Sequence, residues 1–234
     1  MIHQCYFRAD QRDHLFSHAP YQPFGLELQV NETLIERCPE LKDAAARLAL
    51  VEYAAMLYHW RDCAADQDDW IGFTSYRQLA KSQFVFRDKS DVVAGLTHSD
   101  VLSWGIWDAS RMQLAWLRGA AAQAEIASPM LHQFTLDVLA YFGVKLPAAY
   151  LAGHCIPLAN YWALRRDQFA RYMNWSWPIV CHALTLEHPY KRATPILPTI
   201  DQRKAVGYFA ERLFAIWAIR EGLSIAPMGD VTVG

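Results

Sequence analysis

The sequence has no hydrophobic run long enough to cross a membrane. Nowhere in its 234 residues does it approach the roughly 20 consecutive apolar residues that span a bilayer. Residues 1–8 also lack the positively charged start and the apolar stretch of a signal peptide. These absences predict a cytoplasmic protein, and they leave open its attachment to the inner face of a membrane.

A strong charge of one sign and paired cysteines are also lacking. The formal net charge is −2, which gives no electrostatic footprint for nucleic acid. The five cysteines are an odd number without a C-x-x-C pair, so reduced and mostly buried thiols are expected. We therefore expect neither nucleic-acid binding nor a structural zinc site.

No internal repeat and no Gly/Ser-rich linker divides the chain. Apolar residues make up 53% of it, which is enough to build a sizeable core. Short apolar runs alternate with helical patterns along the sequence. This alternation predicts a helix-rich α/β fold, in one domain over residues 1–234.

The apolar pattern gives approximate bounds for the elements. Short apolar runs predict strands at Ile2–Phe7, Asp69–Arg77, Asp91–Thr97 and Pro157–Leu164. Helical periodicity predicts helices at Leu41–Cys63, Ala109–Ala122, Pro129–Phe142, Arg166–Leu184 and Asp201–Arg220. Pro178 is expected to kink its helix, and the last helix is expected to end before Gly222.

The helix predicted at Leu41–Cys63 is apolar on nearly every face. A helix that is apolar all round is a buried helix, so we expect it to pack against the sheet. The strand through Ile71–Phe73 is equally apolar, and we expect it to be central in that sheet.

Two charged residues, Glu52 and Arg77, stand in apolar surroundings. A buried carboxylate needs a partner, so Glu52 either forms an ion pair that locks its helix to a loop or orients a site arginine or a substrate hydroxyl. Arg77 ends a predicted strand, and ligands of open α/β sheets bind beyond the carboxyl ends of strands. Its planar, permanently charged fork suits a diphosphate. The alternative for Arg77 is an ordinary surface arginine.

Asp66-Gln67-Asp68 has the letters of the D-x-D motif, in which two carboxylates hold Mn²⁺ or Mg²⁺ on a diphosphate. The motif precedes the predicted strand instead of following it. That order places it at the end of the sheet opposite the expected site. We therefore interpret it as a solvated turn.

Glu211 points away from the core face of its predicted helix. Its neighbours on that side are the small residues Gly207, Ala215 and Ala218. Small neighbours leave room for a ligand beside the carboxylate, and they equally suit an ordinary glutamate facing solvent.

Some aromatic and imidazole side chains are candidates for binding a sugar. Trp104 and Trp107 lie in a predicted loop close to His98. Aromatic faces can stack on sugar rings, although most of the nine tryptophans are expected in the core or at an interface. His154 is by default a core histidine.

Three blocks of sequence, taken in order, resemble one family. The first runs from Val51 to Trp60 and continues in Asp69-Trp-Ile-Gly-Phe-Thr-Ser-Tyr-Arg77. The second is Ala159–Trp175, and the third is Gly207–Trp217, which opens Gly-Tyr-Phe-Ala-Glu-Arg-Leu. They are similar to the Glu-Leu-Thr…Trp helix with Gly-x-x-His-Tyr-Arg-Arg, the Asn-Met-Phe segment and the Gly-Phe-x-Ala-Glu-Arg-Leu block of one group of enzymes. The chain thus resembles the bacterial capsular-polysaccharide and lipopolysaccharide glycosyltransferases of the GT-A type.

This resemblance implies a GT-A-like, Rossmann-like mixed sheet flanked by helices. It also implies a nucleotide-sugar donor and transfer to a saccharide hydroxyl of a cell-surface polysaccharide. Glu211 takes the place of the general base of an inverting enzyme. The donor-binding residues are then Arg77, Tyr76, Ser75 and Glu52, and the acceptor-binding candidates are Trp104, His98, Asn160 and His154. No residue is assigned to a metal, and a Mn²⁺ or Mg²⁺ ion that arrives with the donor is left open.

Two positions depart from the family's pattern. Ser75 stands where the family has histidine, and Gln78 stands where it has a second arginine. These departures leave two alternatives to an active transferase. One is a non-catalytic relative that binds nucleotides or sugars, and the other is a helix-rich interaction module that presents exposed tryptophans to a partner.

Overall fold

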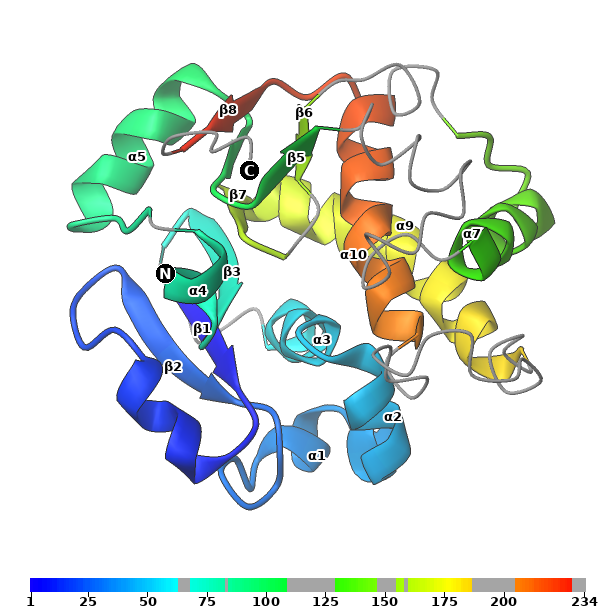
Figure 1. Ribbon diagram of the computed structural model, residues 1–234, viewed down its shortest axis with the longest axis horizontal. Coiled ribbons are helices and arrows are strands. Elements are labelled where there is room, and N and C mark those ends of the chain that lie inside the picture. The colour runs from blue at the N-terminus through cyan, green and yellow to red at the C-terminus, as the bar shows by residue number, and fades with distance from the viewer. Residues whose placement is uncertain are drawn as a thin grey trace.

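The computed structural model describes residues 1–62, 68–82, 84–108, 129–146, 155–157, 160–186 and 205–228. These ranges form an α/β fold on a mixed six-stranded sheet, in the order β2-β1-β3-β7-β4-β8 (Figure 1). Its strands are β1 (Ile2–Tyr6), β2 (Tyr21–Gly25), β3 (Trp70–Ser75), β4 (Val101–Ser103), β7 (Trp162–Arg165) and β8 (Ile225–Pro227). A separate antiparallel ribbon joins β5 (Ile106–Asp108) to β6 (Cys155–Pro157). The predicted α/β class and mixed, Rossmann-like sheet are confirmed.

The helices account for most of the remaining described residues. They are η1 (Ala9–His14), α1 (Leu34–Arg37), η2 (Pro39–Lys42), α2 (Ala44–Leu50), α3 (Tyr53–Arg61), α4 (Gln78–Lys81), α5 (Lys89–His98), α7 (Pro129–Tyr141), α9 (Arg166–Thr185) and α10 (Ala205–Arg220). In Figure 1, α5 lies on one side of the sheet, and α3, α9 and α10 lie on the other.

The main core fills the side of the sheet covered by α3, α9 and α10. Trp162 of β7 stacks on Phe214 of α10, with ring centroids 4.1 Å apart. His3 of β1 stacks on His59 of α3 at 3.5 Å, which joins that helix to the sheet. A second apolar cluster, on the opposite face, includes Trp70 and Phe86.

Strand direction decides which side chains meet at each edge of the sheet. β1 is parallel to β2 and β3, β4 is parallel to β8, and β7 is antiparallel to both β3 and β4. The carboxyl ends of β1, β3 and β4 therefore lie at one edge, together with the amino end of β7. β3 has a partner on each side, so the prediction of a central strand through Ile71–Phe73 is confirmed.

The long helix predicted at Leu41–Cys63 is wrong as a single element. It is divided into the end of η2, then α2 and α3, with a break at Val51. Asp43 caps the first turn of α2 by accepting a hydrogen bond from the Ala45 N–H at 2.8 Å. Burial of the segment is confirmed, because five consecutive residues, Tyr53–Leu57, are fully enclosed.

The strand predicted at Asp91–Thr97 is also wrong, because these residues lie in helix α5. The Asp88 carboxylate caps the helix by accepting hydrogen bonds from the Ser90 and Asp91 N–H groups, at 2.8 and 3.2 Å. Val92 and Leu96, four residues apart, are buried on one face, while Val93 is 51% exposed. The apolar pair thus follows the helical period, not the alternation of a strand.

Other helix predictions agree with the structure within a few residues. α7 confirms the segment from Pro129, and α9 continues past Pro178 to Thr185. α10 ends at Arg220, two residues before Gly222, whose φ of +68° suits glycine. The segment Pro157–Leu164 holds the end of β6 and the start of β7. The helix predicted at Ala109–Ala122 lies outside the described residues.

In the part of the chain that the structure describes, no helix is long and apolar enough to cross a membrane.

Candidate active site at the carboxyl edge of the sheet

Residues from three strand ends meet where β1, β3 and β4 finish and β7 begins. Ser75, Tyr76 and Arg77 follow one another at the end of β3. Asn160 and Tyr161 immediately precede β7, which pairs antiparallel with β3. The Tyr76 N–H donates to the carbonyl of Cys5 at 2.8 Å, so the ends of β1 and β3 stay in register here.

Tyr161 is the polar centre of this edge. Its side chain is 1% exposed, and its hydroxyl lies 2.6 Å from the Ser75 hydroxyl. Burial raises the pKa of Tyr161, the Ser75 hydrogen bond lowers it, and the negative charges of Glu52 and Glu211 raise it further. The positive charge of Arg77 opposes them. Tyr161 thus stays protonated, and residues from three separate elements act on its hydroxyl.

Glu52 reaches this edge because the chain breaks just before it. Val51 has φ 53° and ψ −129°, a conformation that a β-branched residue rarely adopts. Glu52 then stands at the start of α3 with a side chain only 9% exposed. Its Oε2 atom is enclosed and has no hydrogen-bond partner. Within the described residues Glu52 forms no ion pair, and a buried carboxylate oxygen without a partner is the kind of atom that a ligand can satisfy.

Gly207 brings the helix that carries Glu211 against the same break. A Cβ atom on Gly207 would lie 2.7 Å from Cγ2 of Val51 and 2.9 Å from the carbonyl oxygen of Ala49. Only glycine allows so close an approach. Glu211 stands four residues later, on the same face of α10, where it is half-buried.

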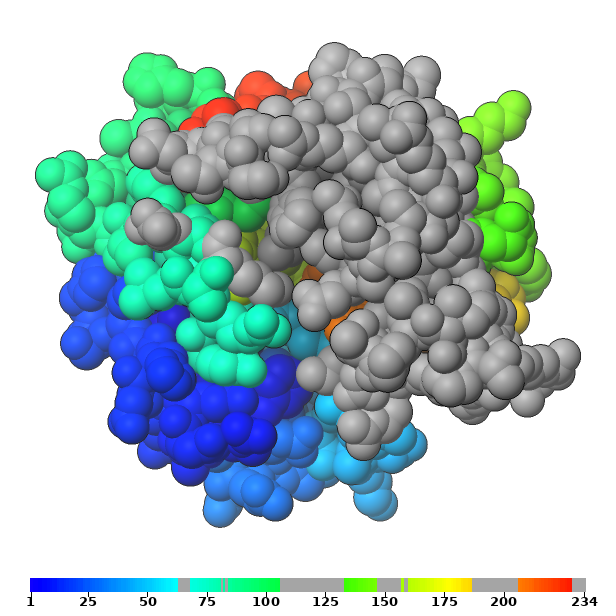
Figure 2. Space-filling model, in the orientation of Figure 1, coloured from blue at the N-terminus to red at the C-terminus, as the bar shows by residue number. Residues whose placement is uncertain are grey.

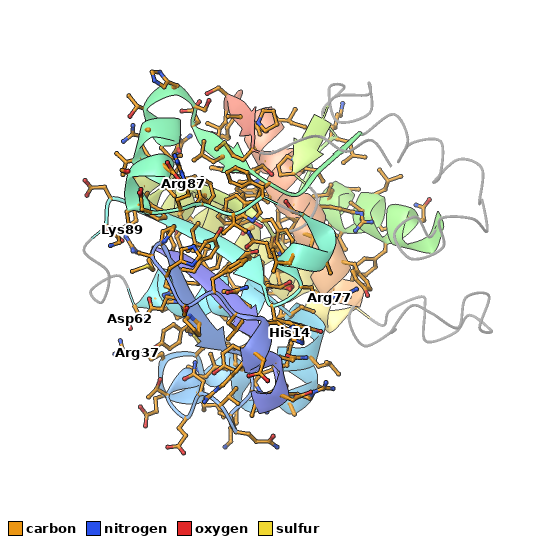
Figure 3. All side chains as sticks on the ribbon, turned by 60° about the vertical axis from the view of Figure 1, so that its left-hand side comes forward. His14, Arg37, Asp62, Arg77, Arg87 and Lys89 are labelled. Atoms are coloured by element: carbon orange, nitrogen blue, oxygen red, sulfur yellow. The ribbon has the colours of Figure 1, made fainter. Side chains whose placement is uncertain are left out.

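Arg77 follows the end of β3 by two residues, and its side chain is exposed (labelled in Figure 3). Its backbone N–H donates to the Ser75 hydroxyl at 3.2 Å, which ties the arginine to the polar centre. Within the described ranges no acidic side chain pairs with the Arg77 guanidinium, so its charge is available to an anion. In Figure 2 the surface is hollowed beside α4, and atoms of α3 and α10 are visible at the bottom of the hollow.

Two further polar atoms at this edge are buried without a partner. The Asn160 side chain is 3% exposed, and its Oδ1 atom accepts no hydrogen bond. Trp104, directly after β4, is also 3% exposed, and its indole N–H donates to nothing. Its backbone N–H donates to the carbonyl of Tyr161 at 3.1 Å, so both residues belong to one edge. Native proteins rarely leave such atoms unpaired, which suits groups that meet a ligand.

The structure does not bring every predicted site residue to this edge. His98 ends α5 and is exposed beside the amino end of β4, which is the opposite edge of the sheet. Asp68 is there too, where it accepts hydrogen bonds from Lys89 at 2.9 Å and from the terminal amine of Met1 at 3.0 Å. His154 lies outside the described residues, as do Asp66 and Gln67 and the side chain of Trp107.

Among the described residues no three His, Cys, Asp or Glu side chains gather as metal ligands would. The carboxylates at the edge are Glu52 and Glu211, and neither belongs to a D-x-D pair. Within the described ranges, the surroundings of these two carboxylates do not form a metal site by themselves.

Sequence reasoning did not identify Tyr161 as a site residue. Its only signal was its position next to Asn160 at the start of a predicted strand. Tyr161 lies near Ser75 because β7 runs antiparallel to β3. A single sequence does not show the relative direction of two strands, so this neighbourhood could not be predicted.

Comparison with known proteins gives a structural match. A solved structure described as the apo form of the bifunctional glycosyltransferase WbbM superposes with a TM-score of 0.61 at 13% sequence identity. The match covers 97% of this chain and 44% of that one, so this chain spans less than half of that protein's length. No protein-family model matches the sequence, and no curated protein matches it. At this identity the match shows that the two chains share a fold.

Proposed function

We propose that this chain is a nucleotide-sugar-dependent glycosyltransferase that transfers a sugar to a saccharide hydroxyl at the carboxyl edge of the sheet. The observation that carries the proposal is the convergence on Tyr161 and Ser75. The buried Tyr161 hydroxyl lies 2.6 Å from the Ser75 hydroxyl and within electrostatic reach of two carboxylates, Glu52 and Glu211, and of the exposed cation Arg77. An acid–base group and an anion-binding group at one edge of a sheet are what sugar transfer from a diphosphate requires.

Glu211 is the proposed general base. A sugar hydroxyl is a weak nucleophile near neutral pH, so transfer benefits from a carboxylate that takes its proton. As the acceptor oxygen bonds to the anomeric carbon, the bond from that carbon to the diphosphate oxygen breaks. The nucleoside diphosphate leaves with the electron pair, and the product is inverted. Arg77 stabilises the negative charge that develops on the leaving group.

The buried unpaired atoms are proposed to hold the two sugars. The Glu52 carboxylate and the Asn160 amide oxygen are acceptors, so they suit the O–H groups of sugar rings. We assign Ser75 and Tyr76 to the donor side because they end β3 and follow it. We place Glu52 with them because its charge acts on Cys5 in β1, the strand beside β3. Asn160 and Trp104 are assigned to the acceptor side. Ser75 and its partner Tyr161 are both buried. We therefore propose that they position the neighbouring groups and take no part in the transfer reaction.

The family resemblance supports a finer proposal about the acceptor. It favours a growing capsular or lipopolysaccharide chain, assembled on the cytoplasmic side of a bacterial membrane. Any attachment of this protein to that membrane would be peripheral. A Mn²⁺ or Mg²⁺ ion that enters with the donor diphosphate is compatible with this scheme.

Donor binding is the first test. We expect a thermal-shift screen against UDP-, GDP-, TDP- and CMP-sugars, with and without manganese, to identify a stabilising donor. Arg77→Ala should weaken that donor's binding about ten- to hundredfold, because a charge-assisted contact to phosphate is worth about 1.5–3 kcal/mol. Its melting temperature should stay close to wild type, because the side chain is exposed and unpaired.

The matched control is Arg87→Ala. Arg87 is also an exposed arginine, but its guanidinium pairs with Asp91 at 3.1 Å on α5, and Figure 3 shows it well away from Arg77. This control should not change donor binding. If no nucleotide sugar binds the wild-type protein, the proposed function is wrong. If a donor binds but is never transferred or hydrolysed, the chain is a binding relative that lacks catalysis.

A further inference from the structure

A pocket of about 270 Å³ lies between η1 and α4, and no step proposed so far uses it. Leu15, Phe16, Tyr76 and Leu79 form its apolar and aromatic walls, and Asp13 and His14 are its polar members. η1 follows β1 and α4 follows β3, and these strands are parallel neighbours. In the sheet, β1 lies between β2 and β3, which are the next two strands along the chain. The chain therefore adds β2 on one side of β1 and β3 on the other, and the direction in which strands are added reverses at β1. Ligands of open α/β sheets bind outside the strand ends at such a point.

The size and lining of the pocket limit what it can hold. Pockets for whole small molecules measure about 300–1,000 Å³, so this one suits part of a larger ligand. Leu79 is 58% exposed, which leaves an apolar side chain open at the wall. Phe16 contributes an aromatic ring, and its neighbour in the fold is Tyr21, with ring centroids 4.5 Å apart. A flat, mostly apolar group with a few polar atoms fits this lining.

Positive charge lies beside the pocket, not inside it. Arg77 is the residue after the wall residue Tyr76. Arg8, two residues after β1, also interacts electrostatically with Tyr76. The Arg8 guanidinium is held by Asp10 through two hydrogen bonds, of 3.0 and 2.9 Å. Asp13 makes the pocket itself unsuitable for phosphate. A ligand with a flat, uncharged end and a negatively charged end would therefore place the flat end in the pocket.

We propose that the pocket between η1 and α4 binds the nucleoside of the donor, with its base against Phe16 and Leu79. Its phosphates then pass Tyr76 to reach Arg77, with Arg8 as a second cation near their path. Asp13 and His14 provide polar contacts for the base edge or the ribose hydroxyls. This inference rests on the proposed function, because it presumes that the ligand is a nucleotide sugar.

The test separates the base from the phosphates. Binding of UDP, GDP and inorganic pyrophosphate to the full chain is measured by calorimetry for wild type, Leu79→Trp, Val93→Trp and Arg77→Ala. Leu79→Trp takes up the space of the pocket and should weaken the preferred nucleoside diphosphate roughly tenfold or more. It should leave pyrophosphate binding unchanged. Arg77→Ala should weaken both ligands.

Val93→Trp is the matched control, because Val93 is also apolar and 51% exposed but lies on α5. It should change neither affinity. Leu79→Glu is a second pocket variant, and it places a carboxylate against the base without filling the space. If both Leu79 variants bind nucleoside diphosphate as wild type does while Arg77→Ala does not, the pocket assignment is wrong and the proposed function stands. If wild type binds pyrophosphate and nucleoside diphosphate equally, the pocket holds no nucleoside.

Discussion

Glu211 is the residue whose replacement should separate catalysis from binding. Glu211→Gln keeps the shape of the side chain and removes its ability to take a proton. We expect turnover to fall about 10²–10⁴-fold, which is the usual contribution of a positioned acid–base group. The donor dissociation constant should stay at its wild-type value, because Arg77 and the neighbouring residues are intact. Steady-state kinetics and calorimetry on the same preparation measure the two quantities.

Glu221→Gln is the control for this variant. Glu221 stands ten residues further along the chain, just past the end of α10, where it pairs with Arg171 on the surface. Its replacement should leave turnover unchanged. Turnover of Glu211→Gln close to wild type would remove Glu211 as the base, and a product with retained configuration would argue against it too.

At the level of single residues, the sequence predicted side-chain chemistry better than side-chain partners. Glu52 was expected to be either paired or at a site, and only the structure shows that one of its carboxylate oxygens is buried without a hydrogen-bond partner. Trp104 was considered as a possible exposed contact for a partner, but it is 3% exposed. Its burial removes one motive for the interaction-module alternative. These outcomes depend on tertiary neighbours that local sequence does not contain.

The break between α2 and α3 is the element that orients Glu52, and it carries backbone strain. Val51 holds a positive φ, which costs a non-glycine residue about 1–3 kcal/mol. Glycine relieves this strain, and alanine does not. Glycine usually costs about 0.5–1 kcal/mol relative to alanine within an element. At position 51 we expect the reverse, with Val51→Gly about 1 kcal/mol more stable than Val51→Ala.

Urea unfolding of the two variants measures this difference, and comparing them with each other cancels the lost valine side chain. If Val51→Ala were instead more stable than Val51→Gly, the backbone at the break would not be strained. The close approach of Gly207 to Val51 gives a reason why the strained conformation is kept, because α10 packs directly onto the break.

At the level of elements, long and strongly periodic segments were predictable and short apolar ones were not. α9 and α10 follow the helical period over many residues, and their predicted bounds were nearly right. Asp91–Thr97 has too few apolar residues to distinguish a helix from a strand by period alone. The capping carboxylate of Asp88 was the missed signal for its helix. The break at Val51 has no sequence signal, since valine is an unusual residue for it.

At the scale of the whole molecule, the α/β class followed from the alternation of patterns, but the strand order did not. The candidate site forms because β7 pairs antiparallel with β3, which places Tyr161 beside Ser75. Pairings between segments so far apart in sequence are set by the packing of the whole chain. That residues 1–234 form one domain stays a prediction.

Asp100 ties the start of β8 to the body of the fold. Its carboxylate accepts hydrogen bonds from the Ser224 hydroxyl at 2.7 Å, the Ser224 N–H at 2.8 Å and the Gln168 amide at 3.1 Å. The bonds from Ser224 lower the pKa of Asp100. A folded-state pKa below the unfolded value, about 3.9, gives stability that is fully present above that value. The stability is lost as the pH falls through the lower, folded-state pKa.

Asp100→Asn should therefore destabilise the protein at pH 7 by about 1 kcal/mol, a figure that allows for solvent screening of this partly exposed group. The difference from wild type should disappear once the pH has fallen through the lowered folded-state pKa, where Asp100 is protonated in wild type too. Urea midpoints measured from pH 7 down into the acid range test this. In a Ser224→Ala background the effect should shrink, because the main partner is gone. Asp100 adjoins the amino end of β4, at the edge opposite Ser75, so turnover at pH 7 should not change. A difference between Asp100→Asn and wild type that is independent of pH would mean that the charge of Asp100 contributes nothing to stability.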